Sequence, residues 1–413
     1  MKKICLITTG QPTTNPRLVK EADALVESGY EVKVIAAYWA DWARNLDDEL
    51  LKTRSWSCQY VGGDPHKNPI KYFWTRTRYG VSNRLRQMSP TSAVFDNQVV
   101  SRVSPDLCSA ALNVPADLYI AHNLGALPAA ALAGKTNKTK IGFDAEDFHS
   151  GETPSQNGSG PIDSLSRRIE GKYLPLCDYI TASSSGIASA YEEAYSLKKA
   201  SIIWNVFPLS DRPPQRGKHD SNEPIRLYWF SQTIGASRGL EDVIAAMGML
   251  PDQSMELHLR GIWQPGYEAR LSAFATKHEV DWNRVKVHTP ESADQMVRLA
   301  AGYDIGLALE PPVSLNRQLC ASNKIFTYLL AGNAILASAT SGQKEIVDLI
   351  GDAGVSYESG DANGLASLLR RWCEDRTALQ HAKDASWDCG TNEFNWDRHK
   401  KKFLSVIEST LSS

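Results

Sequence analysis

The sequence lacks the features that mark several protein classes. Its seven cysteines are scattered, odd in number and form no C-x-x-C pair, so the sequence spells no disulfide framework, zinc ribbon or thioredoxin-type motif. No apolar run approaches the roughly 18 residues of a transmembrane helix. The run Ile4–Ile7 is also too short for the apolar part of a signal peptide. Free thiols without an export segment predict a reducing, cytoplasmic setting.

The sequence also lacks an excess of positive or negative charge. Lys and Arg number 45 against 47 Asp and Glu, giving a net charge of −2. This balance provides no global field for nucleic acid, so we expect no nucleic-acid partner. No G-x-G-x-x-G follows an expected strand, and no two histidines lie within five residues, so neither a dinucleotide fingerprint nor an H-x-x-x-H metal site is present.

Short β-rich runs alternate with helical patterns along almost the whole chain of 413 residues. The runs Lys3–Thr8, Glu31–Ala36, Leu118–Ala121 and Ile141–Asp144 are typical of buried strands. The alternation predicts an α/β protein with parallel sheets covered on both faces, arranged as two doubly wound Rossmann-like domains that face a cleft.

A polar, proline-rich stretch interrupts this rhythm at residues 208–224. We therefore predict an N-terminal Rossmann-like domain over 1–207, a linker over 208–224 and a C-terminal Rossmann-like domain over 225–390. A helix over 391–413 is predicted to pack back toward the N-terminal domain. In such sheets ligands bind beyond the carboxyl ends of the strands, so the loops after the strands are the candidate sites.

Two cations are predicted at helix starts in the C-terminal half. Arg238 ends the loop that follows the strand Ile225–Phe230, and Lys324 lies in the first turn of a helix that Ser322 can cap. A cation opposes the helix dipole there by about 0.3–1 kcal/mol, and a bound anion would remove that cost. The alternative is a solvated arginine, or one paired with Glu241.

A polar cluster follows the strand at Ile141; its members are Asp144, Glu146, Asp147, His149 and Glu152. Such groups serve acid–base chemistry or metal binding. A solvated acidic loop with a helix-capping aspartate is the alternative. His122 follows the preceding strand, and a lone histidine is more often structural than catalytic.

Residues 66–87 hold basic and aromatic side chains and no acid. This mixture suits an anionic membrane surface or a lipid-linked substrate, and the contact is expected over residues 67–86. Single-stranded nucleic acid would also fit. The plainer alternative is a helix whose aromatic residues belong to the core and whose charges are solvated.

The stretch from Asn323 to Gly332, followed by Ala334–Ser338, resembles the donor helix of the family-four retaining glycosyltransferases, which have the GT-B fold. That helix usually reads N/P-K-L-F-E-Y-x-A-x-G-x-P-V-x-A-S. The segments "LYWFSQTIGASRGLEDVIAAM", "IIWNVFPL", "DLYIAHN" and "FDAEDFH" are supporting matches. The resemblance covers nearly the whole chain and is strongest over about 225–350.

The resemblance implies a metal-independent transferase that uses a nucleotide-diphosphate sugar as donor and needs no cofactor. It makes 1–207 the acceptor-side domain, whose candidate residues are Asp144, Glu146, Asp147 and His149, and 225–390 the donor domain. Arg238 and Lys324 would hold the diphosphate and stabilise the leaving nucleotide. His122 would lie near the donor sugar, and Gly10 would bring backbone close to donor and acceptor. Glu345 would flank the nucleotide. The other implied donor contacts are Ser231, Gln232, Asn323 and Thr327.

The sequence departs from the family pattern at a pair of carboxylates, whose positions hold Leu319 and Thr327. Thr327 offers one hydroxyl where a carboxylate accepts two hydrogen bonds. Glu310 is the nearby acid that we expect to replace the missing group at the sugar. Ser231 also stands where the family commonly has glycine.

These observations predict a retaining glycosyltransferase of surface polysaccharide or glycolipid synthesis, with a saccharide or lipid-linked acceptor. It would be cytoplasmic, with peripheral contact to the inner face of the membrane as a further option. The missing carboxylates keep a non-catalytic GT-B-like partner subunit open. A nucleotide-sugar epimerase on the same fold is the third reading.

Overall fold

The chain forms two compact units, each built around one parallel sheet. The computed structural model describes residues 1–89, 92–154, 163–215 and 223–413. Among these residues, unit 1 consists of Met1–Thr153, residues 163–203 and Lys400–Ser413. Unit 2 contains Trp204–His399. The division falls after Ile203, earlier than the predicted boundary at 207. Residues 216–222 of the predicted linker lie outside the described residues.

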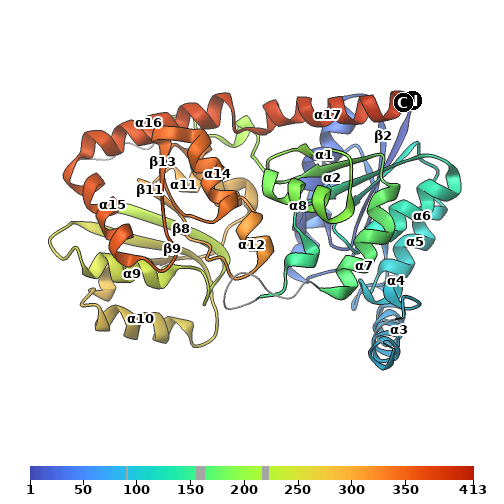
Figure 1. Ribbon diagram of the computed structural model, residues 1–413, viewed down its shortest axis with the longest axis horizontal. Helices are drawn as coiled ribbons and strands as arrows, with labels where there is room; N and C mark the ends of the chain where they lie inside the picture. The colour runs from blue at the N-terminus through green and yellow to red at the C-terminus, as the bar shows by residue number, and fades with distance from the viewer. Residues whose placement is uncertain (90–91, 155–162, 216–222) are drawn as a thin grey trace. The chain divides into compact units, whose positions relative to one another are not determined.

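The sheet of unit 1 has seven strands in the order β3-β2-β1-β4-β5-β6-β7 (Figure 1). The strands are β1 Lys3–Thr8, β2 Glu31–Ala37, β3 Ser57–Val61, β4 Leu118–His122, β5 Lys140–Ala145, β6 Tyr179–Ala182 and β7 Ser201–Ile202. The helices are α1 Pro16–Glu27, α2 Trp42–Lys52, α3 Pro69–Met88, α4 Asp96–Val99, α5 Ser104–Leu112, α6 Leu127–Asn137, α7 Ser164–Tyr173 and α8 Ser185–Tyr195. Every strand pair is parallel, as the alternation predicts.

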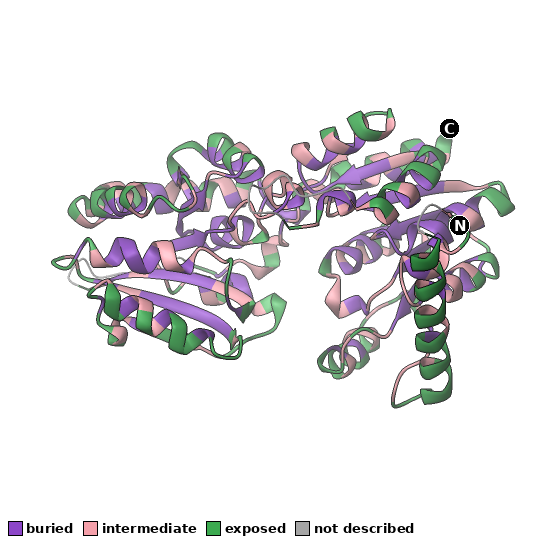
Figure 2. Cartoon of the chain, turned by 60° about the horizontal axis from the view of Figure 1, so that its bottom comes forward, coloured by how far each residue is buried: buried purple, intermediate pink, exposed green. Residues whose placement is uncertain are grey.

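The sheet of unit 2 has six strands in the order β10-β9-β8-β11-β12-β13, again all parallel. They are β8 Ile225–Ile234, β9 Met255–Trp263, β10 Val285–His288, β11 Ile305–Ala308, β12 Ala334–Ser338 and β13 Gly354–Tyr357. The helices are α9 Leu240–Gly248, α10 Tyr267–Lys277, α11 Met296–Ala300, α12 Leu315–Leu319, α13 Asn323–Ala331, α14 Ser341–Ile350, α15 Ala362–Glu374 and α16 Arg376–Asn392. Figure 2 shows the strands buried and the outer faces of many helices exposed.

The last helix, α17 Trp396–Ser412, divides between the units. Its first turn hydrogen-bonds into unit 2, where the Trp396 amide donates to the Phe207 carbonyl over 2.8 Å. Its remainder packs on unit 1, with Lys400 Nζ 2.8 Å from Glu27 Oε2 and Lys2 donating to the Leu411 carbonyl. No helix in the described ranges is both long and apolar enough to cross a bilayer.

Candidate functional site

Unit 2 holds a buried ion pair at the carboxyl end of its sheet. Glu310 comes shortly after β11, and Lys324 is the second residue of α13. Lys324 Nζ contacts Glu310 Oε1, and the two side chains keep only 12% and 9% of their surface exposed. The ammonium also lies 5.5 Å from the centre of the Trp229 ring, within cation–π range.

Two arginines add positive charge around Glu310. Burial lowers the pKa of the Arg238 guanidinium, and the nearby Arg317 cation lowers it further, while Glu310 acts in the opposite direction. Arg317 lies on α12, whose first turn Ser314 caps by accepting a hydrogen bond from the Arg317 amide at 3.2 Å. Sequence analysis missed Arg317; its place in a short capped turn after β11 was the available signal.

A glycine brings Arg238 close to this charge cluster. Gly239 precedes α9 with φ of +76°, and a Cβ built on it would lie 2.4 Å from the Leu309 carbonyl oxygen. Only glycine therefore allows the loop before α9 to approach the end of β11 so closely. Glu241, the alternative partner for Arg238, instead pairs with Arg270 at 3.5 Å.

The charge balance of this cluster favours an anion. Burial alone would raise the pKa of Glu310, but the touching Lys324 ammonium outweighs burial and the pKa lies below its usual value. Glu310 is therefore ionised, and its second oxygen, Oε2, is buried without a hydrogen-bond partner. Three cations, Arg238, Arg317 and Lys324, face one carboxylate, which leaves an excess of positive charge for a ligand such as a diphosphate.

Other predicted donor contacts lie differently from expectation. Ser231 and Gln232 were expected in a loop, but β8 continues to Ile234 with a register shift between Phe230 and Thr233. They therefore lie on an irregular strand end, where Ser231 is half-buried and Gln232 exposed. The bulge lets polar residues extend the strand, which the alternation pattern did not indicate.

The helix α13 also corrects two expectations. Thr327 is fully buried, and its hydroxyl donates to the Asn323 carbonyl over 3.3 Å, so it is directed to the backbone of its own helix. Ser322 stands at the N-cap of α13, but its side chain makes no capping hydrogen bond. Asn323 is exposed at the helix start, and Glu345 is half-buried on α14. Their donor roles stay predictions.

Unit 1 contains a second charged cluster, in this case fully sealed. His122 ends β4 with no exposed surface; its Nε2 lies 3.3 Å from Glu21 Oε2 and its Nδ1 3.3 Å from Asp144 Oδ2. Arg17 of α1 donates two hydrogen bonds to Asp144, from Nε to Oδ2 over 2.6 Å and from Nη2 to Oδ1 over 2.7 Å. Thr181 adds a hydrogen bond of 2.7 Å to the same carboxylate.

This burial corrects the expectations for His122 and Asp144. Burial disfavours the charged imidazole, but the flanking carboxylates outweigh it and raise the pKa of His122 to about 10. Both ring nitrogens face carboxylates and no surface is exposed, so in this structure His122 does not reach a donor sugar. Asp144 is likewise held by Arg17 inside unit 1 and is not available to an acceptor.

Glu21, His122 and Asp144 also stand close enough together to share a metal ion. No local pattern indicates this grouping, because Glu21 lies far from the other two residues along the chain. The guanidinium of Arg17 already supplies the positive charge beside Asp144. We therefore assign the group as an ion-pair network that joins α1 to β4 and β5.

The remaining acceptor-side candidates lie on the segment after β5 and are partly exposed. Burial, helped by the Asp144 charge, raises the pKa of Glu146 to about 7, and its Oε1 has no hydrogen-bond partner. Asp147 is half-buried, and His149 Nδ1 lies 2.7 Å from Glu152 Oε1. A carboxyl that titrates near neutral pH suits proton transfer.

Gly10 follows β1 at the carboxyl edge of the same sheet. It is half-buried, and its carbonyl accepts a hydrogen bond of 3.1 Å from the Ala37 amide at the end of β2. Its expected approach to donor and acceptor stays a prediction.

Comparison with known proteins identifies the fold. No protein-family model matches the sequence, and no curated protein matches it either. Solved structures do match, over the full length of both chains. HepE of Anabaena, solved in complex with UDP and glucose, superposes with a TM-score of 0.70 and 16% identity, covering 99% of this chain and 100% of the other.

Two further matches are sucrose-phosphate synthase of Thermosynechococcus elongatus and a mutant of S. aureus TarM, the latter in complex with UDP and other ligands. Their TM-scores are 0.65 and 0.71 at 14% and 8% identity, with 100% of both chains covered in each case. The chain thus has the GT-B fold. This fold, with its seven- and six-stranded parallel sheets, is the one that the sequence predicts and that solved retaining glycosyltransferases share.

Proposed function

We propose that the chain is a retaining glycosyltransferase whose unit 2 holds a nucleotide-diphosphate sugar. The observation that carries the proposal is the cluster of three cations around Glu310 at the start of α13. A helix N-terminus and excess positive charge both attract phosphate. The solved structures of HepE and TarM, which share the fold, contain UDP, and UDP is therefore the first nucleotide to test.

The same cluster would supply the catalysis. Bond cleavage places a developing negative charge on the leaving nucleotide, and fixed cations in a partly buried site stabilise such charge. Lys324 and Arg238 take this role, with Arg317 beside them. Glu310 is the acid closest to them and takes the place at the sugar that the missing carboxylates leave open. No metal ion is needed for these steps.

The acceptor side is assigned to unit 1. Glu146 is partly exposed, and its pKa of about 7 allows it to hold or release a proton near neutral pH. Gly10, Asp147 and His149 follow strands of the same sheet. We propose a saccharide or lipid-linked acceptor, in the synthesis of a surface polysaccharide or glycolipid. Cytoplasmic placement, with peripheral contact to the inner membrane face, completes the proposal.

A product assay separates this proposal from its rivals. The chain is incubated with UDP-sugars, and then with other nucleotide sugars, with and without saccharide and lipid-linked acceptors, while free nucleotide is measured. A transferase releases nucleotide in step with a glycosylated acceptor. An epimerase converts the donor alone without releasing nucleotide. A non-catalytic subunit binds nucleotide sugar but yields neither product, and that result with every acceptor would contradict transfer.

A further inference from the structure

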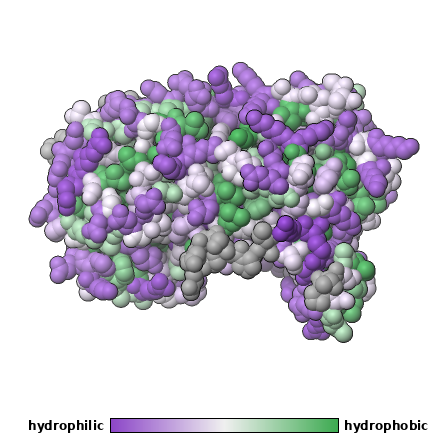
Figure 3. Space-filling view, in the orientation of Figure 1, coloured by the Kyte–Doolittle hydropathy of each residue, from purple (hydrophilic) through white to green (hydrophobic). Residues whose placement is uncertain are grey.

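The helix α3 presents an apolar stripe to the outside of unit 1. At 3.6 residues per turn, six apolar side chains fall on one side of this helix. Their exposed fractions are high: Ile70 85%, Phe73 62%, Trp74 63%, Val81 51%, Leu85 40% and Met88 82%. For Phe73 and Trp74 this corrects the reading in which the aromatic residues of the segment belong to the core. The projecting α3 region of Figure 3 carries hydrophobic atoms on its surface.

The inner side of α3 is polar, so the helix is inverted relative to an ordinary surface helix. Thr75 is fully buried and donates to the Gly62 carbonyl over 3.0 Å. Arg102 donates to the Thr75 hydroxyl at 2.5 Å, and Arg78 pairs with Asp106 at 2.5 Å. Polar bonds thus hold the helix in place, and its apolar side is left for something outside unit 1.

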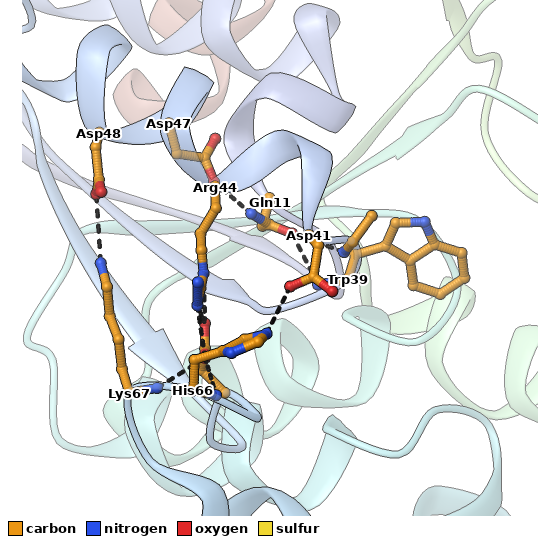
Figure 4. A network of polar contacts seen from close by, with 10 residues as sticks. Gln11, Trp39, Asp41, Arg44, Asp47, Asp48, His66 and Lys67 are labelled. Carbon is orange, nitrogen blue, oxygen red and sulfur yellow. Dashed lines mark hydrogen bonds and ion pairs between the residues drawn. The ribbon is translucent and has the colours of Figure 1, made fainter.

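The start of α3 is fixed in the same way, through the network in Figure 4. Asp64 accepts hydrogen bonds from the His66 and Lys67 amides and pairs with Arg44 of α2 at 3.1 Å. His66 Nε2 lies 2.9 Å from Asp41 Oδ1. The exposed stripe therefore stands on a helix whose start is held by polar contacts.

The charges around the stripe are basic and indicate an anionic partner. Between Asp64 and Asp96 the sequence has no acidic residue. Arg76 and Arg84 are exposed and form no ion pair with the described residues. We infer that α3 docks unit 1 on an anionic lipid bilayer, with its apolar stripe in the interface and its arginines at the headgroup phosphates.

Other occupants fit the same surface less well. A second copy of the chain would bring two basic helices together, and like charges oppose that contact. Single-stranded nucleic acid needs a series of aromatic platforms, and in the stripe Phe73 and Trp74 provide rings, whereas Ile70, Val81, Leu85 and Met88 offer no ring for stacking and no hydrogen bond to a base. The aliphatic residues along the stripe favour a lipid partner over nucleic acid.

Vesicle flotation of the full-length chain tests the inference. We expect binding to phosphatidylcholine vesicles that hold about one quarter phosphatidylglycerol to exceed binding to pure phosphatidylcholine by about tenfold, and to weaken in high salt. The double variant Phe73→Glu/Trp74→Glu replaces exposed side chains with helix-forming ones and should lose about tenfold or more. Leu349→Glu, at a position 60% exposed on α14, is the matched control and should bind like the wild type.

The inference is overturned if the wild type fails to float, if it binds both vesicles equally, or if the double variant floats like the wild type. A wild-type dimer that the double variant converts to monomer, without vesicle binding, assigns the stripe to a second copy. Labelled single-stranded DNA bound tightly by the wild type but not by the variant assigns it to nucleic acid. Because flotation needs neither donor nor turnover, its failure leaves the proposed sugar transfer untouched.

Discussion

The contact between Glu310 and Lys324 predicts that removing the acid tightens nucleotide binding. In the ligand-free chain the Glu310 carboxylate is bound to the Lys324 ammonium, which a diphosphate would need as its own partner. The variant Glu310→Gln keeps the size of the side chain and removes its charge. We expect UDP to bind this variant more tightly than the wild type, because the phosphate no longer has to displace a charged competitor.

The magnitude follows from the kind of contact. A hydrogen bond between charged groups contributes a net of about 1.5–3 kcal/mol. If UDP must break this hydrogen bond, its removal raises the affinity by the same free energy, or about 10- to 150-fold. Without UDP, the free energy of unfolding of the Glu310→Gln variant should be lower by about 3 kcal/mol, because Lys324 loses its charged partner in a mostly buried place.

Calorimetric titration with UDP and thermal unfolding with and without UDP measure both effects. Asp348→Asn on α14 is the control, since Asp348 is 65% exposed and pairs with Lys344 on the surface at 3.6 Å. The control should leave both quantities unchanged. If Glu310→Gln binds UDP no more tightly than the wild type, Glu310 and the phosphate do not compete for Lys324, and the reasoning is refuted.

Three further predictions concern the framework of the two sites. Gly239→Ala should lower the free energy of unfolding by several kcal/mol and abolish UDP binding, because its Cβ would lie 2.4 Å from a backbone oxygen. Gly266→Ala has a similar φ of +78° but open space around it, and should lower the free energy of unfolding by about 1 kcal/mol. Chemical denaturation and titration of both variants check this; equal losses would contradict it. Arg17→Met should lower stability by about 3–5 kcal/mol because it strands a buried aspartate, while Arg54→Met, whose ion pair is about 30% exposed, should cost under about 1 kcal/mol in the same measurement. The raised pKa of His122, about 10, stabilises unit 1 fully below pH of about 6.5 and progressively less up to pH of about 10. The wild type should therefore lose stability between pH of about 7 and 10 relative to His122→Gln, and parallel pH profiles would contradict this.

The sequence predicted elements where local pattern and burial agree. Lys3–Thr8 is a strand at the predicted bounds, and the helix predicted after Ser322 runs over Asn323–Ala331. In each case a β-rich run or an apolar helical face also becomes the buried face. The strand Ile225–Phe230 was predicted too short, because a bulge carries β8 through the polar residues that follow.

The site was predictable only in part. Lys324 was predicted from its place at a helix start and Glu310 from its place after a strand, but their contact joins residues from different elements, and no local pattern encodes it. The sealing of His122 could not be foreseen, because it depends on Arg17 and Glu21 from a helix far earlier in the chain. Partners distant in sequence decide whether a charged residue after a strand becomes a site or an internal ion pair.

The most direct test of the central claim is UDP binding to variants that lack one cation of unit 2. Lys324→Ala, Arg238→Ala and Arg317→Ala are compared by calorimetry with Lys344→Ala and Arg270→Ala, which remove cations whose side chains are 59% and 67% exposed in the same unit. Each of the first three should weaken UDP binding by about tenfold or more, since a charge-assisted contact contributes about 1.5–3 kcal/mol, and the two controls should not. Wild-type affinity in both Lys324→Ala and Arg238→Ala would contradict a diphosphate site at this cluster.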